Sequence, residues 1–176
     1  MDIKELLNQF TLFDPAKGQR ADFPAVEGNY IVVLKAGCNI PDVLGNFKYT
    51  EVSLCGEDYR VLYTGIAKDL KKRIWANHLH GNGGNSTLRK TLGSLFGYQK
   101  IPRDNNYQIN KKTKFGAEDE NSLTAWMEHN LLFAYLANDK RNELESYLID
   151  SLLPPLNVEG SKASTLQRVH ELRSDK

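Results

Sequence analysis

The 176-residue sequence has little of what marks several protein classes. It holds two cysteines, Cys38 and Cys55, too few for a disulfide framework and without metal-ligand spacing, so we assign them no chemistry. No apolar run approaches the roughly 18 residues that a membrane helix needs. The first residues, MDIKELLNQFTLF, mix charges with helical periodicity and do not resemble a signal peptide. We therefore expect a cytoplasmic protein with no membrane partner.

Excess charge of one sign is also missing, because the net charge is only +1. The charges are nevertheless segregated along the chain. Residues 60 to 114 hold twelve Lys or Arg against two acids, giving +10, whereas the rest holds eleven bases and twenty acids, giving −9. A basic segment of this density favours a polyanionic partner such as nucleic acid. A solvated basic face without a partner is the alternative.

The order of elements predicts a single α/β domain over residues 1–176. After an N-terminal helix, NYIVVL predicts a first core strand, residues 35–59 an insertion, YRVLYTG a second strand, and the following residues a helix through about His78. A helix capped by Ser86 or Thr87 runs to about Phe96. Residues 97–120 predict a long surface loop, followed by a short helix capped by Asn121 or Ser122. LLFAYLA predicts a third strand, and a helix follows from about Lys140 to Leu152.

The last of these helices carries an informative carboxylate. At helical spacing Glu145 shares a stripe with Leu148, Ile149 and Leu152, the face that must be buried. An ionised carboxylate is costly to desolvate, so Glu145 should be paired, hydrogen-bonded or bound to a metal. The alternatives are a position at the edge of the stripe or an ion pair with an arginine.

Two tyrosines mark the core strands. Tyr30 lies in GNYIVVL, and LYTG places Tyr63 and Gly65 around Thr64. Arg73 follows ten residues after Tyr63, in KDLKKR. Downstream, ESYLIDSLLPPLN supplies Glu145 and, twelve residues later, Asn157 behind two prolines.

These spaced motifs resemble the GIY-YIG nuclease superfamily over roughly residues 28 to 158, with Thr64 where the family usually has Ile. The resemblance implies a small three-stranded, mainly antiparallel central sheet flanked by helices, with insertions at about 35–59 and 97–120. It also implies a metal-dependent endonuclease that hydrolyses DNA phosphodiester bonds.

Two features depart from the family pattern. The tyrosines are 33 positions apart, so residues 35–59 elaborate the usual short hairpin. Four residues after Arg73, where many relatives have His or Tyr, this chain has Asn77. On an α-helix His80 would return to the face of Arg73, while His78 would turn away by about 140°. His80 and His78 are candidate catalytic residues, and an ordinary polar helix end is the alternative.

The resemblance implies a role for each matched residue. Tyr30 or Tyr63 would act as base, and Arg73 would hold a phosphate oxygen. Glu145 would bind one Mg²⁺ or Mn²⁺, with no organic cofactor. Asn157 would position backbone near the site, beside Gly65.

The basic segment would then bind DNA through phosphate contacts that weaken with salt. The candidate residues are Lys68, Lys71, Lys72, Arg89, Lys90, Lys111, Lys112 and Lys114. Two other functions stay open, which are a catalytically silent nucleic-acid-binding module of the same fold and a plain interaction domain. The sequence does not decide the oligomeric state.

Overall fold

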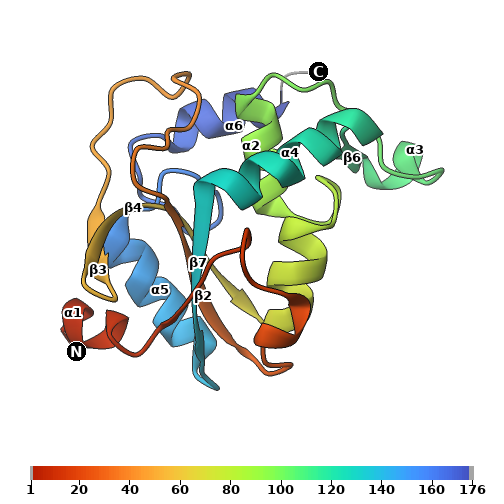
Figure 1. Cartoon of the computed structure of the whole chain (residues 1–176). Helices are drawn as coiled ribbons and strands as arrows, with labels where there is room; N and C mark the ends of the chain where they lie inside the picture. The colour runs from red at the N-terminus through yellow and green to blue at the C-terminus, as the bar shows by residue number, and fades with distance from the viewer. Residues whose placement is uncertain (1, 175–176) are drawn as a thin grey trace.

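The structure is a computed structural model that describes residues 2–174. Its centre is a five-stranded antiparallel sheet of order β1-β7-β2-β4-β3, with helices on both faces (Figure 1). The strands are β1 (Thr11–Phe13), β2 (Gly28–Leu34), β3 (Glu51–Leu54), β4 (Glu57–Ala67) and β7 (Leu131–Ala137), and a separate hairpin pairs β5 (Ile101–Pro102) with β6 (Thr113–Lys114). The helices are α1 (Ile3–Leu7), η1 (Arg20–Asp22), η2 (Lys71–Leu79), α2 (Thr87–Leu95), α3 (Tyr107–Asn110), α4 (Ala117–Asn130), α5 (Arg141–Leu152) and α6 (Leu166–Ser174).

The expected α/β architecture is confirmed, but the expectation of a three-stranded sheet is wrong. The three anticipated strands are β2, β4 and β7, which occupy the centre. Two short strands of three and four residues, β1 and β3, add to the edges. β1 lies at the end of the stretch MDIKELLNQFTLF that is predicted to be helical, and β3 lies in the turn-rich insertion, within its short strand-like run YTEVSL. The strand β3 comes from the insertion between β2 and β4 and pairs with β4.

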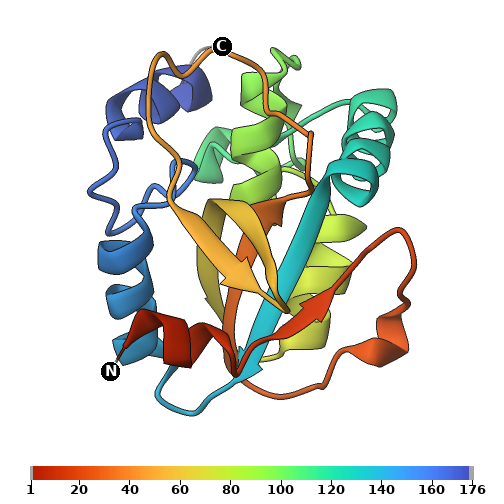
Figure 2. The same cartoon turned by 60° about the vertical axis from the view of Figure 1, so that its left-hand side comes forward.

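The sheet is buried on both faces because helices cover each of them, and the side chains of a strand alternate between the two faces. Tyr30, Val32 and Leu34 of β2 face the layer of η2, α2, α4 and α6, whereas Ile31 and Val33 face α1 and α5. Figure 2 shows α1 in front of the lower end of the sheet, whereas η2 and α2 lie behind the sheet. This explains why residues 30–34 of β2 form a continuous apolar run rather than an alternating one.

Helix α4 begins earlier than the sequence predicts, whereas α5 ends at the predicted residue. Helix α4 begins at Ala117 rather than after Asn121, and its first turn carries three acids that favour a helix N-terminus. Helix α5 ends at Leu152, where Leu153 turns to a positive φ of 44° before the two prolines. None of the helices over residues 2–174 is long and apolar enough to cross a membrane.

Candidate active site

The two tyrosines are brought together by the pairing of β2 with β4. Tyr30 lies opposite Gly65 in this antiparallel register, two residues along β4 from Tyr63. The Tyr30 and Tyr63 ring centroids are 6.2 Å apart. A Cβ on Gly65 would lie 2.3 Å from the Tyr30 hydroxyl oxygen, so the ring can cross β4 only because this residue is glycine.

The segment after Asp69 is a π-helix, η2, in which backbone hydrogen bonds join residues five apart. At its end the His80 N–H donates to the Trp75 carbonyl over 3.0 Å. Because a π-helix has more residues in each turn than an α-helix, His78 returns toward the side of Arg73. The expectation that His78 turns away from Arg73 is therefore wrong, since it assumed α-helical spacing.

His78 is fully buried and meets Tyr30 directly. Its Nε2 lies 2.6 Å from the Tyr30 hydroxyl oxygen, and its Nδ1 lies 2.6 Å from Ser86 Oγ. Ser86 caps α2, because its Oγ also accepts a hydrogen bond from the Arg89 backbone N–H. The imidazole thus connects the tyrosine on β2 to the start of α2.

His80 lies outside this cluster. Its exposed ring packs on Trp75 with centroids 4.4 Å apart, and its Nε2 is 3.9 Å from a Glu128 carboxylate oxygen. In this geometry His80 is not placed to share the chemistry of Arg73, and the extra residue per turn of the π-helix is the reason.

A cavity of about 320 Å³ brings the other predicted residues together. Its lining comes from β4, η2, the start of α2, α5 and the segment after α5: Tyr63, Gly65, Ile66, Arg73, Thr87, Asn142, Glu145, Asn157, Val158 and Glu159. Tyr30 lies directly behind it, against Gly65, with His78 beyond. Sequence reasoning missed Glu159, which stands only two residues after the Asn157 motif.

Asn157 holds the strand on which the site is built. Its Oδ1 accepts from the Thr64 backbone N–H over 2.9 Å, and its Nδ2 donates to the Thr64 carbonyl over 3.0 Å. These bonds are buried and take the place of a neighbouring strand. They fix the backbone between Tyr63 and Gly65.

Burial keeps both phenols protonated near neutral pH. Desolvation raises the pKa of Tyr30 well above its usual range, and neighbouring Tyr63 raises it further, while the charge of Arg73 opposes both. Desolvation likewise raises the pKa of Tyr63, against the lowering effect of Arg73. A lasting phenolate on either tyrosine is therefore unfavourable.

The imidazole of His78 is neutral for related reasons. Desolvation first, and then the positive charges of Arg73 and Arg89, hold its pKa well below the usual range. A neutral imidazole keeps one ring nitrogen free to accept a proton. Its contact with Tyr30 therefore suits proton transfer.

Arg73 faces the cavity with part of its donor capacity unused. Its Nε is buried and finds no hydrogen-bond partner among residues 2–174. A guanidinium donates through five N–H groups in a planar fork that matches phosphate oxygens. An unpaired buried donor beside a cavity suits an anionic ligand there.

Two carboxylates in the cavity fit a hard divalent cation. Burial raises the pKa of Glu145, repulsion from Glu159 raises it further, and Arg73 opposes both. A cation between the two would offset this repulsion, and an oxygen-only donor set completed by water suits Mg²⁺ or Mn²⁺. Over the described residues there is no cluster of three or more His, Cys, Asp or Glu side chains that could hold a metal. Among the described residues, the fit of the cavity to a divalent cation therefore depends on the carboxylates of Glu145 and Glu159 alone.

The predicted DNA-binding residues fall into two groups beside the site, with one exception. Lys68 and Lys72 line a shallow hollow with Arg73, and Lys71 lies beside them on η2. Lys90, Lys111 and Lys112 line a second hollow, and Lys114 belongs to the nearby strand β6.

The exception is Arg89, which does not fit a nucleic-acid contact because its side chain is fully buried. Its guanidinium pairs with Glu120 at 2.8 Å and donates to the carbonyls of His78 and Leu79. Arg89 lies on the buried face of α2 rather than on its solvent face, so its charge is balanced by Glu120 inside the protein. It anchors α2 and α4 to the end of the π-helix.

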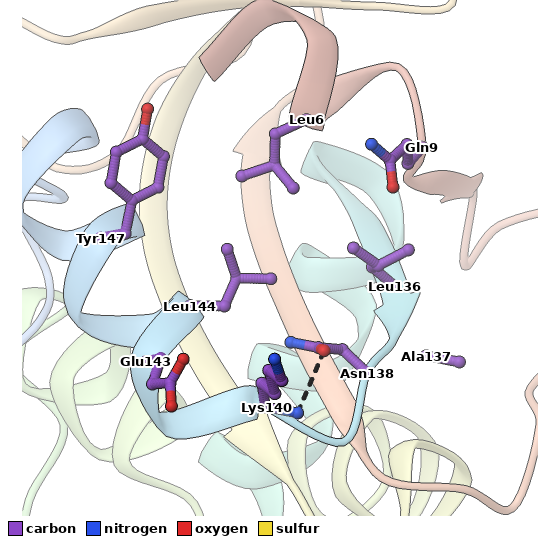
Figure 3. A pocket seen from close by; sticks show the side chains of 9 residues that line it. All are labelled: Leu6, Gln9, Leu136, Ala137, Asn138, Lys140, Glu143, Leu144 and Tyr147. Atoms are coloured by element: carbon purple, nitrogen blue, oxygen red, sulfur yellow. Dashed lines mark hydrogen bonds between the residues drawn. The ribbon is translucent and has the colours of Figure 1, made fainter. Parts of the chain in front are cut away.

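A more apolar cavity of about 330 Å³ lies between α1, the end of β7 and the start of α5 (Figure 3). Leu6, Leu136, Leu144 and Tyr147 are among its lining residues. It holds none of the predicted site residues, and α5 separates it from the cavity of Glu145. The predicted site residues therefore lie on the other side of α5.

Comparison with known proteins gives a family match. A family model described as the GIY-YIG catalytic domain matches residues 28–175. Neither a curated protein nor a solved structure matches the chain. The matched range covers every residue that lines the cavity of Glu145, and it includes α6.

Proposed function

The chain belongs to the GIY-YIG catalytic domain family, a family of nucleases, and on that basis we propose that it is an endonuclease that hydrolyses DNA phosphodiester bonds. One observation carries the proposal. Tyr63, Arg73 and Glu145, which come from three separate elements, line one cavity. Behind them Tyr30 is hydrogen-bonded to a buried imidazole.

Arg73 binds the scissile phosphate in this proposal. Its guanidinium offers a permanently charged donor fork beside the cavity, and its Nε has no partner in the described part of the chain. Charge that develops on the phosphoryl oxygens during attack by water is stabilised by donors already in place. Arg73 therefore acts on both binding and rate.

The proton of the attacking water travels through the two tyrosines to His78. Tyr63 faces the cavity and takes the proton from water as it passes its own to Tyr30, whose proton moves to His78 Nε2. Both phenols end neutral, as their burial requires, and the imidazole ends charged. In the tautomer that this path needs, Nδ1 carries the hydrogen and donates to Ser86 Oγ.

Substrate binding strengthens this base. The positive charge of Arg73 is one of the causes that lower the pKa of His78. A phosphate bound to Arg73 offsets that charge, so the pKa of the imidazole rises when substrate is present. The base is thus weak in the free enzyme and stronger in the complex.

GIY-YIG nucleases generally use a divalent metal, and Glu145 is the residue that would hold it here, with Glu159 at the same cavity. When bound, Mg²⁺ or Mn²⁺ supplies Lewis-acid stabilisation of negative charge on the phosphate and leaving oxygens. The half-buried Glu145 is well placed for this because its carboxylate is already partly desolvated.

A matched pair of substitutions on α5 tests the proposal. Glu145→Gln removes the charge at the cavity, and Glu143→Gln changes an exposed carboxylate one half-turn earlier. With supercoiled plasmid and synthetic branched DNA in Mg²⁺ or Mn²⁺, we expect the wild type and Glu143→Gln to nick DNA. Glu145→Gln should cut at least about 100-fold more slowly while binding DNA with similar affinity.

The same experiment separates the competing functions. A wild-type protein that binds DNA but never cuts it under any metal condition is the silent binding module. One that shows no salt-sensitive DNA binding is an interaction domain, and the proposal then fails entirely. Retention of the Tyr30–His78 contact, despite Asn77 at the family's usual position, favours the enzyme.

A further inference from the structure

A second hollow of about 370 Å³ adjoins the catalytic cavity. It lies where the glycine-rich loop of residues 81–85 leads into α2, opposite the loop before β6 and the end of α6. Lys90, Lys111, Lys112 and Arg173 bring four cations to it from three segments of the chain. Among the described residues no carboxylate lines it, and the remaining lining consists of glycines, hydroxylated side chains and the amide of Asn85. Such a lining suits an anion with several oxygen atoms.

Thr87 connects the two cavities, because it lines both of them. Arg173 connects them electrostatically. It lines the hollow, and burial lowers the pKa of its guanidinium, while the nearby Tyr63 in the catalytic cavity acts in the opposite direction. Its Nη1 also lies 3.3 Å from Thr91 Oγ1, which fixes the guanidinium against α2. An extended ligand that leaves the catalytic cavity past Thr87 would therefore contact Arg173.

Two cations of the hollow, Lys90 and Arg173, lie close enough together to repel each other. Desolvation, and then the charges of Arg173 and Lys100, lower the pKa of Lys90 to about 8, although Glu120 opposes them. Lys90 is held there by hydrogen bonds to the Thr113 carbonyl and hydroxyl oxygens. Like charges in a half-buried hollow repel each other, and a bound anion would relieve that repulsion.

Building on the proposed nuclease function, we propose that this hollow binds a phosphate of the same DNA strand, next to the phosphate that is cleaved. Arg173 and Lys90 are its principal contacts, and Thr87 marks the path of the strand between the two sites. A phosphate is favoured over a base because the lining is cationic and polar rather than aromatic. The C-terminal helix α6 thus contributes a substrate-positioning residue that the sequence motifs do not reveal.

The salt dependence of DNA binding tests this without knowledge of the cleavage sequence. The affinity of a short duplex is measured at several salt concentrations in the Glu145→Gln background, which prevents cutting. Each lost phosphate contact should lower the slope of log K against log[salt] by about 0.9. We expect this loss for Arg173→Gln and for Lys90→Gln, with roughly tenfold weaker binding. Arg173→Lys should retain most of the slope because it keeps the charge.

Arg168→Gln is the matched control. It removes an exposed arginine of the same helix, which faces Glu171 and the Val43 carbonyl rather than the hollow. Its slope should equal that of the parent. Where cutting is measurable, Arg173→Gln should raise KM about tenfold with little change in kcat, because it removes binding away from the reacting phosphate.

Two outcomes overturn the inference, and they are distinguishable from failure of the nuclease proposal. An unchanged slope in both Arg173→Gln and Lys90→Gln, in a protein that binds and cuts DNA, removes the phosphate site and leaves the nuclease standing. Equal slope loss in Arg168→Gln means that only diffuse charge matters, and again removes the site. A protein that never binds DNA ends both proposals together.

Discussion

The Tyr30 hydroxyl lies 2.6 Å from Nε2 of His78, and this contact exists because η2 is a π-helix. With α-helical spacing the fifth residue after Arg73 would turn away from that face. The π-helix therefore brings His78, rather than Asn77 four positions after the arginine, into contact with Tyr30.

The first prediction concerns proton transfer through this contact. His78→Gln removes the proton acceptor behind Tyr30 and should lower kcat by about 10² to 10⁴ with little change in KM. His80→Gln is the control, because His80 packs on Trp75 outside the cluster. Steady-state kinetics on plasmid DNA check the result. Equal kcat values for the two variants would exclude the proton path.

The second prediction concerns acid stability. The pKa of His78 is lowered in the folded protein, whereas in the unfolded chain it is about 6.5. Below pH 6.5 the unfolded chain therefore binds a proton that the folded protein does not. The free energy of unfolding should fall with decreasing pH by at most about 1.4 kcal/mol per unit from this group, and be fully retained above pH 6.5.

Denaturant titrations of the wild type and His78→Gln at several pH values measure this effect. The variant lacks the titrating group, so its stability deficit relative to the wild type should narrow as the pH falls from 7 to 5. A deficit that stays constant over that range would mean that His78 does not titrate on unfolding.

The site was largely predictable from spacing, and its details were not. Tyr63, Arg73 and Glu145 stand on elements that hydrophobic periodicity identifies, and the resemblance of their spacing to the GIY-YIG pattern is what predicted that they line one site. The π-helix was missed because periodicity is interpreted with the 3.6 residues per turn of an α-helix. Nothing in the sequence KKRIWANHL indicates hydrogen bonds between residues five apart. The positions of His78 and His80 were consequently exchanged.

The burial of charged side chains is the second feature that could not be predicted from the sequence. Arg89 stands in a basic segment and was assigned to DNA, whereas its partner Glu120 lies in the acidic stretch 31 residues later. A buried ion pair depends on two distant segments meeting, which a linear charge count does not encode. Arg173 was missed for the same reason, since it approaches α2 only in the folded chain.

The third prediction concerns the glycine under Tyr30. Gly65→Ala places a Cβ 2.3 Å from the Tyr30 hydroxyl oxygen and 2.5 Å from its Cζ, and the ring must shift. We expect a loss of about 1 to 3 kcal/mol in unfolding free energy, with strongly reduced cutting. Gly116→Ala is the control, because its Cβ would meet nothing within 4 Å and its φ is −63°. Similar effects for both variants would contradict the close approach.

The fourth prediction separates structure from DNA binding at Arg89. Arg89→Met leaves Glu120 buried without its cation and frees the carbonyls of His78 and Leu79, which should cost about 3 to 5 kcal/mol in unfolding free energy. Lys17→Met removes an exposed cation near Asp14 and should change stability by less than about 0.5 kcal/mol. Thermal unfolding measures both. Near-wild-type stability of Arg89→Met with weakened DNA binding would restore Arg89 as a DNA contact.

The fifth prediction concerns Asn157, whose side chain completes the hydrogen bonding of Thr64. Asn157→Ala leaves two buried backbone groups unpaired, each costing about 1 to 3 kcal/mol. Asn157→Asp keeps the acceptor but loses the donor to the Thr64 carbonyl, and it buries a charge, so it should rescue little. Asn121→Ala, at an exposed position on α4, should leave stability unchanged. Because Thr64 stands between Tyr63 and Gly65, kcat of the folded Asn157 variants at low temperature should fall more than KM rises. An unaltered kcat in a destabilised variant would reduce Asn157 to a role in folding alone.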